Sequence, residues 1–247
     1  MDIALGVIAG AMYFSKYFQI GIPLYWYVSL FLSVIIIYNL DHLLDALKNN
    51  RKPYRFHREK RKKIIILLIA SVMANGIIIM NFFSMQLIKK CLLPGCLMIV
   101  YFIMIHALRL KLLKEITISL IYTYVIILYP FSSDVTLLVS ERPIIPFSYF
   151  LLVLSNVFIF TFNEKKDKKE SSILFRNISL IASFSSLAIC AFAIMNLRDI
   201  PFAVVQIIMS IFLILIGIYH HKLGENEMYG KLADAVFLLS WVIFVWR

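Results

Sequence analysis

The chain has 247 residues, of which 62% are hydrophobic and 16% are charged, and its mean hydropathy is +0.87. These values exclude a soluble globular protein and indicate an integral membrane protein with several transmembrane segments. The formal net charge of +11 does not indicate nucleic-acid binding, because no basic patch is interleaved with aromatic residues on a soluble surface. The three cysteines, Cys91, Cys96 and Cys190, lack the spacing of a metal site, a redox pair or a disulfide framework.

Nine apolar stretches are long enough to cross a bilayer, for which a straight helix needs about 20 residues. They cover residues 2–19, 23–48, 63–83, 88–107, 115–132, 146–164, 173–196, 201–220 and 229–246. The first stretch is not preceded by a basic segment, so we expect a retained helix and not a cleaved signal peptide. The whole chain, residues 1–247, is therefore predicted to form one all-α membrane domain with nine transmembrane helices.

The Lys and Arg residues gather in every second loop. Nine of the 25 lie between Lys48 and Lys63, and further groups follow the fourth, sixth and eighth stretches. Because basic loops stay on the cytoplasmic side of a membrane, we expect these loops and the N-terminus to be cytoplasmic. A bacterial inner membrane is the expected location, with membrane lipids as the surroundings of the bundle.

Polar residues recur at every fourth position where the second stretch ends. Asp41, Asp45 and Asn49 have this spacing, which places them on one face of a helix. Carboxylates at the membrane end of a helix are costly to bury and usually line a cavity or a binding site. Basic residues follow directly, among them Arg55 and Arg58. The pattern indicates a polar site at the cytoplasmic end of this helix.

A second polar stripe closes the sixth stretch. Asn163 and Asp167 are again four residues apart, and Lys168 follows. Two facing stripes of this kind can hold Mg²⁺, which typically binds one or two carboxylates together with phosphate oxygens of a substrate. Nearby Lys and Arg side chains can neutralise the remaining phosphate charge. The sequence thus favours a membrane site for a lipid whose polar end is a diphosphate.

With these two stripes after the second and sixth of nine helices, the chain resembles the UbiA superfamily of intramembrane prenyltransferases. The first motif of that family reads Asn-Asp-x-x-Asp-x-x-x-Asp. In the segment from Asp41 to Asn49, Asp45 and Asn49 take the middle and last acidic positions, and His42 takes the first.

The resemblance extends to three further segments. Asn163 and Asp167 fit the second family motif, with Asn in place of one Asp, and 106–111 lies where the family has a Tyr- and Lys-containing segment. The segments 55–58 and 229–235 look like features of a divergent branch of the family. In topology the resemblance covers the whole chain, and in motifs it covers about thirty residues of it.

The resemblance implies Mg²⁺-dependent transfer of a polyprenyl group from a prenyl diphosphate to an acceptor, usually an aromatic one. Asp41, Asp45 and Asp167 would be the catalytic carboxylates. The implied Mg²⁺ ligands are Asp41, Asp45, Asn49, Asn163 and Asp167, and the implied diphosphate-binding residues are Arg55, Arg58, Lys111, Lys168 and His42. Tyr122, Tyr124 and Tyr129 on the fifth stretch are candidates for lining the site of the prenyl tail.

Other interpretations of the same residues stay open. The two stripes can be interfacial groups that pair with the basic loops, and the Asn residues in acidic positions favour a non-catalytic relative that binds an isoprenoid or quinone. A transporter is a third possibility. A CDP-alcohol phosphotransferase is disfavoured, because its long Asp-rich motif is absent. Lys16 and Asn75 are expected to be snorkelling or helix-packing residues, and Asp234 is expected to contact Lys231.

Overall fold

The computed structural model describes residues 2–48, 55–103, 111–133, 143–164, 169–196, 199–219 and 228–244. Within these ranges the regular structure is helical and includes no strand. Six helices are long and apolar enough to cross a membrane. They are α2 (Leu24–Lys48), α4 (Arg61–Phe82), α5 (Met85–Ile103), α8 (Ile144–Glu164), α9 (Lys169–Met195) and α10 (Ile200–Ile218). The prediction of an all-α membrane protein is therefore confirmed.

The other three predicted spans also coincide with helices. The apolar parts of α1 (Asp2–Phe18) and α6 (Lys111–Ser133) are shorter than those of the six. The last span begins as α12 (Met228–Val236) and continues as a 3₁₀ helix, η4 (Phe237–Phe244). A short helix, α3 (Arg55–Glu59), follows α2. Nine crossings of the membrane stay a prediction, because length and composition alone identify six.

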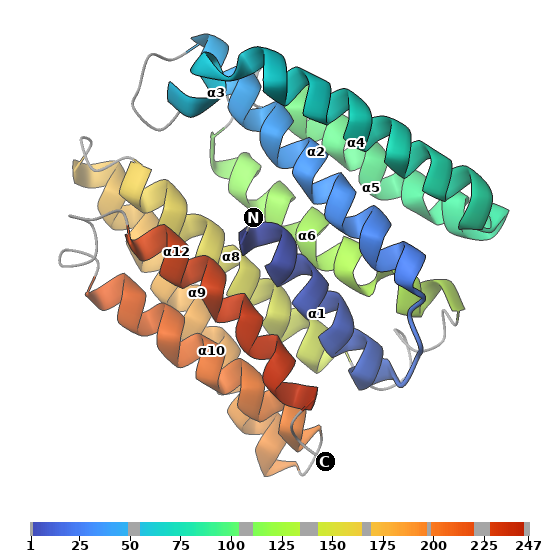
Figure 1. Ribbon diagram of the computed structural model, residues 1–247. Helices are drawn as coiled ribbons and strands as arrows, with labels where there is room; N and C mark the ends of the chain where they lie inside the picture. The colour runs from blue at the N-terminus through green and yellow to red at the C-terminus, as the bar shows by residue number, and fades with distance from the viewer. Residues whose placement is uncertain are drawn as a thin grey trace.

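The helices form two groups that α1 and α6 connect (Figure 1). On one side α4 packs on α2, and α5 packs on α6; on the other side α8, α9 and α10 pack together with α12 and η4. Helix α1 contacts α2, α6 and η4. The end of α2, helix α3, the start of α6 and the end of α8 all lie at one end of the bundle (Figure 1). We call this the α3 end; it is the end that the basic loops predict to be cytoplasmic.

Helix α4 shows how a membrane environment reverses the usual pattern of burial. Its apolar side chains are largely exposed, as expected for contact with lipid, whereas Ser71 and Asn75 are buried. The Asn75 side chain accepts a hydrogen bond from Ser29 Oγ (2.7 Å) and donates one to Ser33 Oγ (3.0 Å), both on α2. Interhelical bonds of this kind hold transmembrane helices together, so Asn75 is the packing residue that the sequence predicts.

Lys16 ties the first helix to the last. Its ammonium group donates a hydrogen bond to the carbonyl of Ile243 and lies 5.3 Å from the centre of the Phe244 ring. The aliphatic stem of a lysine can be buried in an apolar region when its ammonium group contacts a carbonyl oxygen and the face of an aromatic ring. Lys16, the basic residue of the first apolar stretch, therefore forms a packing contact between α1 and η4.

Small hydroxyl residues allow α8 and α9 to approach closely. Ser155 of α8 lies 2.9 Å from Ser179 and 2.6 Å from Ser183 of α9, measured between hydroxyl oxygens. Ser148 makes the same kind of contact with Ser186, at 2.7 Å. Serine at helix interfaces permits close packing and supplies hydrogen bonds in an apolar environment. These contacts hold α8 and α9 together.

Replacing Gly10 with alanine should destabilise the protein by about 1–3 kcal/mol, the usual cost of overpacking. A Cβ at Gly10 of α1 would lie 2.5 Å from the hydroxyl of Tyr149 and 2.9 Å from Cδ1 of Ile126, and both neighbours are fully buried. Gly76→Ala is the matched control, because a Cβ there meets no atom within 4 Å. Thermal unfolding in detergent should show a lower Tm for Gly10→Ala only; equal Tm values would contradict the packing at Gly10.

Candidate functional site

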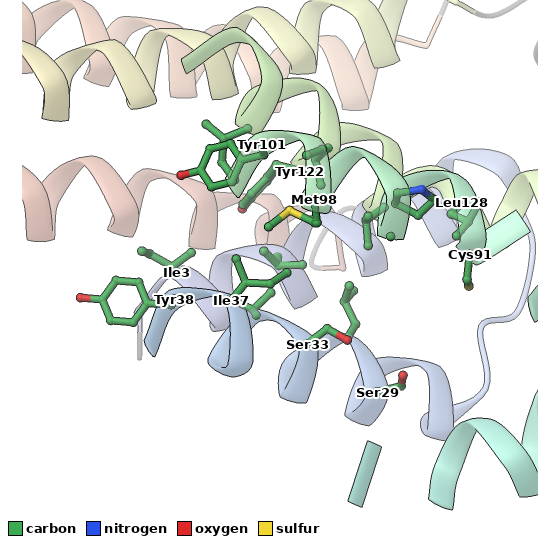
Figure 2. A pocket seen from close by; sticks show the side chains of 18 of the residues that line it. Ile3, Ser29, Ser33, Ile37, Tyr38, Cys91, Met98, Tyr101, Tyr122 and Leu128 are labelled. Atoms are coloured by element: carbon green, nitrogen blue, oxygen red, sulfur yellow. The ribbon is translucent and has the colours of Figure 1, made fainter. Parts of the chain in front are cut away.

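A cavity of about 420 Å³ lies between α1, α2, α5 and α6, next to the end of α4. Ligand pockets typically have volumes of about 300–1,000 Å³, so this cavity can hold a small lipid or the reactive part of a larger one. Its walls are mostly apolar and aromatic (Figure 2). The lining includes Ile3, Val7, Trp26, Leu30, Val34, Ile37, Tyr38, Met98, Tyr101, Ile118, Ile121, Tyr122, Val125 and Leu128.

Helix α2 builds the wall that leads to the predicted polar site. Ser29, Ser33, Ile37 and Asp41 succeed one another at intervals of four residues and all line the cavity, as one face of a helix requires. The hydroxyl groups of Ser29 and Ser33 form hydrogen bonds with Asn75. The middle of this wall is therefore mainly apolar. Asp41 stands at the last position of the row, toward the α3 end.

Asp41 gives the cavity its charge. Of the described residues that line the cavity, it is the one carboxylate, and its side chain is half-buried. Asp45 is the next residue at the interval of four and still belongs to α2; its side chain lies outside the described residues. An apolar cavity with an acidic end can bind an apolar chain whose polar group is held at that end.

Three aromatic side chains gather beside Asp41. The His42 ring lies 4.1 Å from the Tyr38 ring and 5.1 Å from the His57 ring, measured between centroids, and its Nδ1 is 3.2 Å from the Tyr38 carbonyl oxygen. His57 of α3 is buried, and neither of its ring nitrogens has a hydrogen-bond partner. Burial, and to a smaller extent His42, lowers the pKa of His57, so its ring tends to be neutral at pH 7. Arg58, a predicted diphosphate-binding residue, is exposed beside it.

The structure tests the remaining predicted residues only in part. Arg55, Lys111 and Asn163 lie in α3, α6 and α8, but their side chains are outside the described residues, and so are Asn49, Asp167 and Lys168 altogether. The ends of α2 and α8 lie at the same end of the bundle (Figure 1). In the part of the chain that is described, no group of three or more His, Cys, Asp and Glu side chains is placed to hold a metal ion.

One of the three predicted tyrosines lines the cavity. Tyr122 is part of the wall, whereas Tyr124 and Tyr129 pack against the cluster around Trp26 and Leu128. The Trp26 and Tyr129 ring centroids are 5.4 Å apart. Of these three candidates for lining the tail site, Tyr122 is the one among the cavity-lining residues, and the location of the tail stays a prediction.

Glu115 lies at the very start of the fifth apolar stretch. It is not among the residues that the sequence predicts to form the site. It is 3% exposed, its Oε1 accepts a hydrogen bond from Thr161 Oγ1 of α8 at 2.8 Å, and its Oε2 has no hydrogen-bond partner. An acidic residue in an apolar helix is costly to bury. That cost was the available signal, and the bond from Thr161 ties the first part of α6 to the last part of α8.

A second interior carboxylate is held between distant helices. Asp234 of α12 accepts a hydrogen bond at 3.4 Å from Asn156 Nδ2 of α8. The sequence predicts a local contact of Asp234 with Lys231, which is exposed. It does not predict the long-range bond to Asn156. The polarity of Asn156 in the middle of an apolar stretch was the signal that could have found it.

Comparison with protein-family models, with curated proteins and with solved structures gave no significant match to this chain. The functional argument therefore rests on the geometry and chemistry of the residues themselves.

Proposed function

We propose that this protein is a Mg²⁺-dependent intramembrane prenyltransferase with a nine-helix, UbiA-like bundle and an active site on the cytoplasmic side. The observation that carries the proposal is the apolar cavity whose acidic end is Asp41. Asp41 is part of the motif on which the resemblance to the UbiA superfamily rests. Its position in the cavity wall is a separate observation that the motif did not predict.

The prenyl tail would occupy the apolar part of the cavity. Branched hydrocarbon chains fit walls of aliphatic and aromatic side chains, and each buried methylene contributes roughly 0.8 kcal/mol. The charged diphosphate would lie at the α3 end, near Asp41, where the basic residues after α2 are close along the chain. This division places the bond between tail and diphosphate at the boundary between the two environments.

The donor atoms of the polar end suit Mg²⁺. Asp41 and Asp45 supply two carboxylates, the number that Mg²⁺ typically takes from a protein when phosphate oxygens complete its coordination. Asp167, Asn49 and Asn163 are the proposed further oxygen ligands. Arg55, Arg58, Lys111, Lys168 and His42 would hold the diphosphate through charge-assisted hydrogen bonds. When bound, Mg²⁺ would supply charge neutralisation of the leaving diphosphate.

The cavity walls would shape the rest of the reaction. As the carbon–oxygen bond of the prenyl diphosphate breaks, positive charge would develop on the allylic carbon, and the apolar walls of the cavity would keep water away from it. Tyr38, Tyr101 and Tyr122 present aromatic rings in the lining, and such rings attract positive charge. An aromatic acceptor can then attack the allylic carbon.

A second candidate function is binding of an isoprenoid or quinone lipid without chemistry. The observation that favours it lies in the motifs: His42, Asn49 and Asn163 stand at three positions where the resembled family has Asp. Fewer carboxylates would bind Mg²⁺ more weakly. The cavity would serve such a protein equally well.

One experiment separates the two candidates. The protein in nanodiscs is incubated with geranyl, farnesyl and geranylgeranyl diphosphate, with and without Mg²⁺, and both binding and pyrophosphate release are measured. A prenyltransferase binds at least one of them and releases pyrophosphate only with Mg²⁺. Binding without release, also in the presence of aromatic acceptors, supports the non-catalytic candidate; the absence of binding contradicts both.

A further inference from the structure

Two histidine side chains from different helices meet where α3 packs on the end of α2 (Figure 1). The ring centres of His42 on α2 and His57 on α3 are 5.1 Å apart, and the two ring planes are inclined by 42°. The ring of Tyr38, one helical turn before His42, lies 4.1 Å from the His42 ring. Two imidazoles, the commonest metal ligands in proteins, are thus held together by the packing of two helices.

The ring of His57 is buried with both of its nitrogens unused. The residue is 7% exposed, and neither Nδ1 nor Nε2 has a hydrogen-bond partner. A buried polar atom without a partner costs free energy, so each example calls for an explanation, and a bound ion is one. Burial lowers the pKa of His57, which favours the neutral ring, the form that binds a metal.

The hydrogen bond of His42 is the kind that orients a metal ligand. Its Nδ1 lies 3.2 Å from the backbone carbonyl oxygen of Tyr38. Because a carbonyl oxygen only accepts, this contact selects the tautomer with the proton on Nδ1 and the lone pair on Nε2. Metal-binding histidines almost always donate their other ring N–H to a carbonyl or a carboxylate in this way. His42 is half-buried, so the pair is accessible to an ion from the polar side.

The separation of the two rings suits one metal ion between them. An imidazole nitrogen binds Zn²⁺ at about 2.0–2.1 Å, and the centre of its ring lies about 1.2 Å further away. At the tetrahedral angle that Zn²⁺ prefers, two such ring centres are about 5.2 Å apart. The observed distance of 5.1 Å between the His42 and His57 ring centres matches this value, so a small shift of side chains suffices to bind the ion.

We propose that His42 and His57 bind a divalent transition-metal ion, Zn²⁺ or one of similar ligand preference, and that the bound ion clamps α3 onto α2. Imidazole suits Zn²⁺, whereas Mg²⁺ prefers oxygen ligands, so this site differs in chemistry from the proposed Mg²⁺ site. Water completes the coordination. Two protein ligands make a weaker site than the three or four of catalytic and structural zinc centres, and binding is therefore reversible. The inference does not rest on the proposed function, because it concerns metal binding alone.

The test measures Zn²⁺ binding to the full chain in nanodiscs, purified without a histidine tag. His57→Phe and His42→Phe each keep an aromatic ring and remove one ligand, so each should weaken Zn²⁺ binding at least about 10-fold in calorimetric titrations. Mg²⁺ in about 100-fold excess should not displace Zn²⁺. Because the ion joins the two helices, Zn²⁺ should also slow amide hydrogen exchange in α3 at least about 10-fold in the unmodified protein and in neither variant.

A double variant, His220→Phe with His221→Phe, is the matched control, because these residues are the other two neighbouring histidines of the chain. Its Zn²⁺ affinity should stay within about twofold of the unmodified protein, since the proposed ligands are intact. If His57→Phe does not insert, His42→Phe, at a half-buried position, makes the same test. Unchanged affinity in His42→Phe, a loss in the control alone, or displacement by Mg²⁺ would overturn the site. Zn²⁺ binding that leaves hydrogen exchange in α3 unchanged would overturn the clamp.

Discussion

Asp41→Asn is expected to lower Mg²⁺-dependent pyrophosphate release by about 10²-fold or more, the size of effect seen when one group that stabilises a developing charge is lost. Asparagine keeps the shape of the side chain and can still bond its neighbours, so the apolar cavity should persist. Binding of farnesyl diphosphate should weaken much less than release. Pyrophosphate assays and binding isotherms at several Mg²⁺ concentrations measure the two effects separately.

Glu59→Gln is the control for this change, because Glu59 is an exposed carboxylate on α3 near the same end of the bundle. It should leave release unchanged. If the two variants behave alike, Asp41 is an interfacial residue and not part of the active site. If Asp41→Asn shifts the Mg²⁺ concentration for half-maximal release to a higher value, the carboxylate contributes to metal binding.

Gly95→Phe should abolish or strongly weaken binding of long prenyl diphosphates, by at least 10-fold. Gly95 of α5 lines the cavity, and a Cβ there meets no atom within 4 Å. The Cβ of a larger side chain therefore fits without displacing the wall, and we expect the phenyl ring to take up space that the tail would use. Because Gly95 lies in the middle of its helix, away from Asp41, geranyl diphosphate should be affected less than geranylgeranyl diphosphate.

Gly76→Phe provides the matched comparison. Gly76 also lies in the middle of a helix and has open space at its Cβ, but it is not among the residues lining the cavity. Both variants should insert into the membrane with similar Tm values, and only Gly95→Phe should lose binding. A Gly95→Phe variant with normal affinity for every chain length would show that the tail binds elsewhere.

The sequence by itself determined the class of protein and the positions of its helices. Hydropathy is a local property, because a helix of about 20 apolar residues is required wherever the chain crosses lipid. The polar ends of α2 and α8 were predicted for the same reason. Asp41 interrupts an apolar stretch, and the free-energy cost of burying its carboxylate can be inferred without knowing which residues surround it. The roles expected of the motif residues, including Asp41, His42 and Arg58, stay predictions.

Only the tertiary structure decided which faces of the helices meet. In a membrane, lipid-facing and buried surfaces are both apolar, so periodicity does not reveal the rotation of a helix as it does in water. For this reason the sequence did not distinguish Tyr122, in the cavity wall, from Tyr124, which packs against the cluster around Trp26 and Leu128 and is not among the lining residues. It also left unknown the bonds of Asn156 to Asp234 and of Thr161 to Glu115, since each joins helices far apart in the chain whose pairing depends on the packing of the whole bundle.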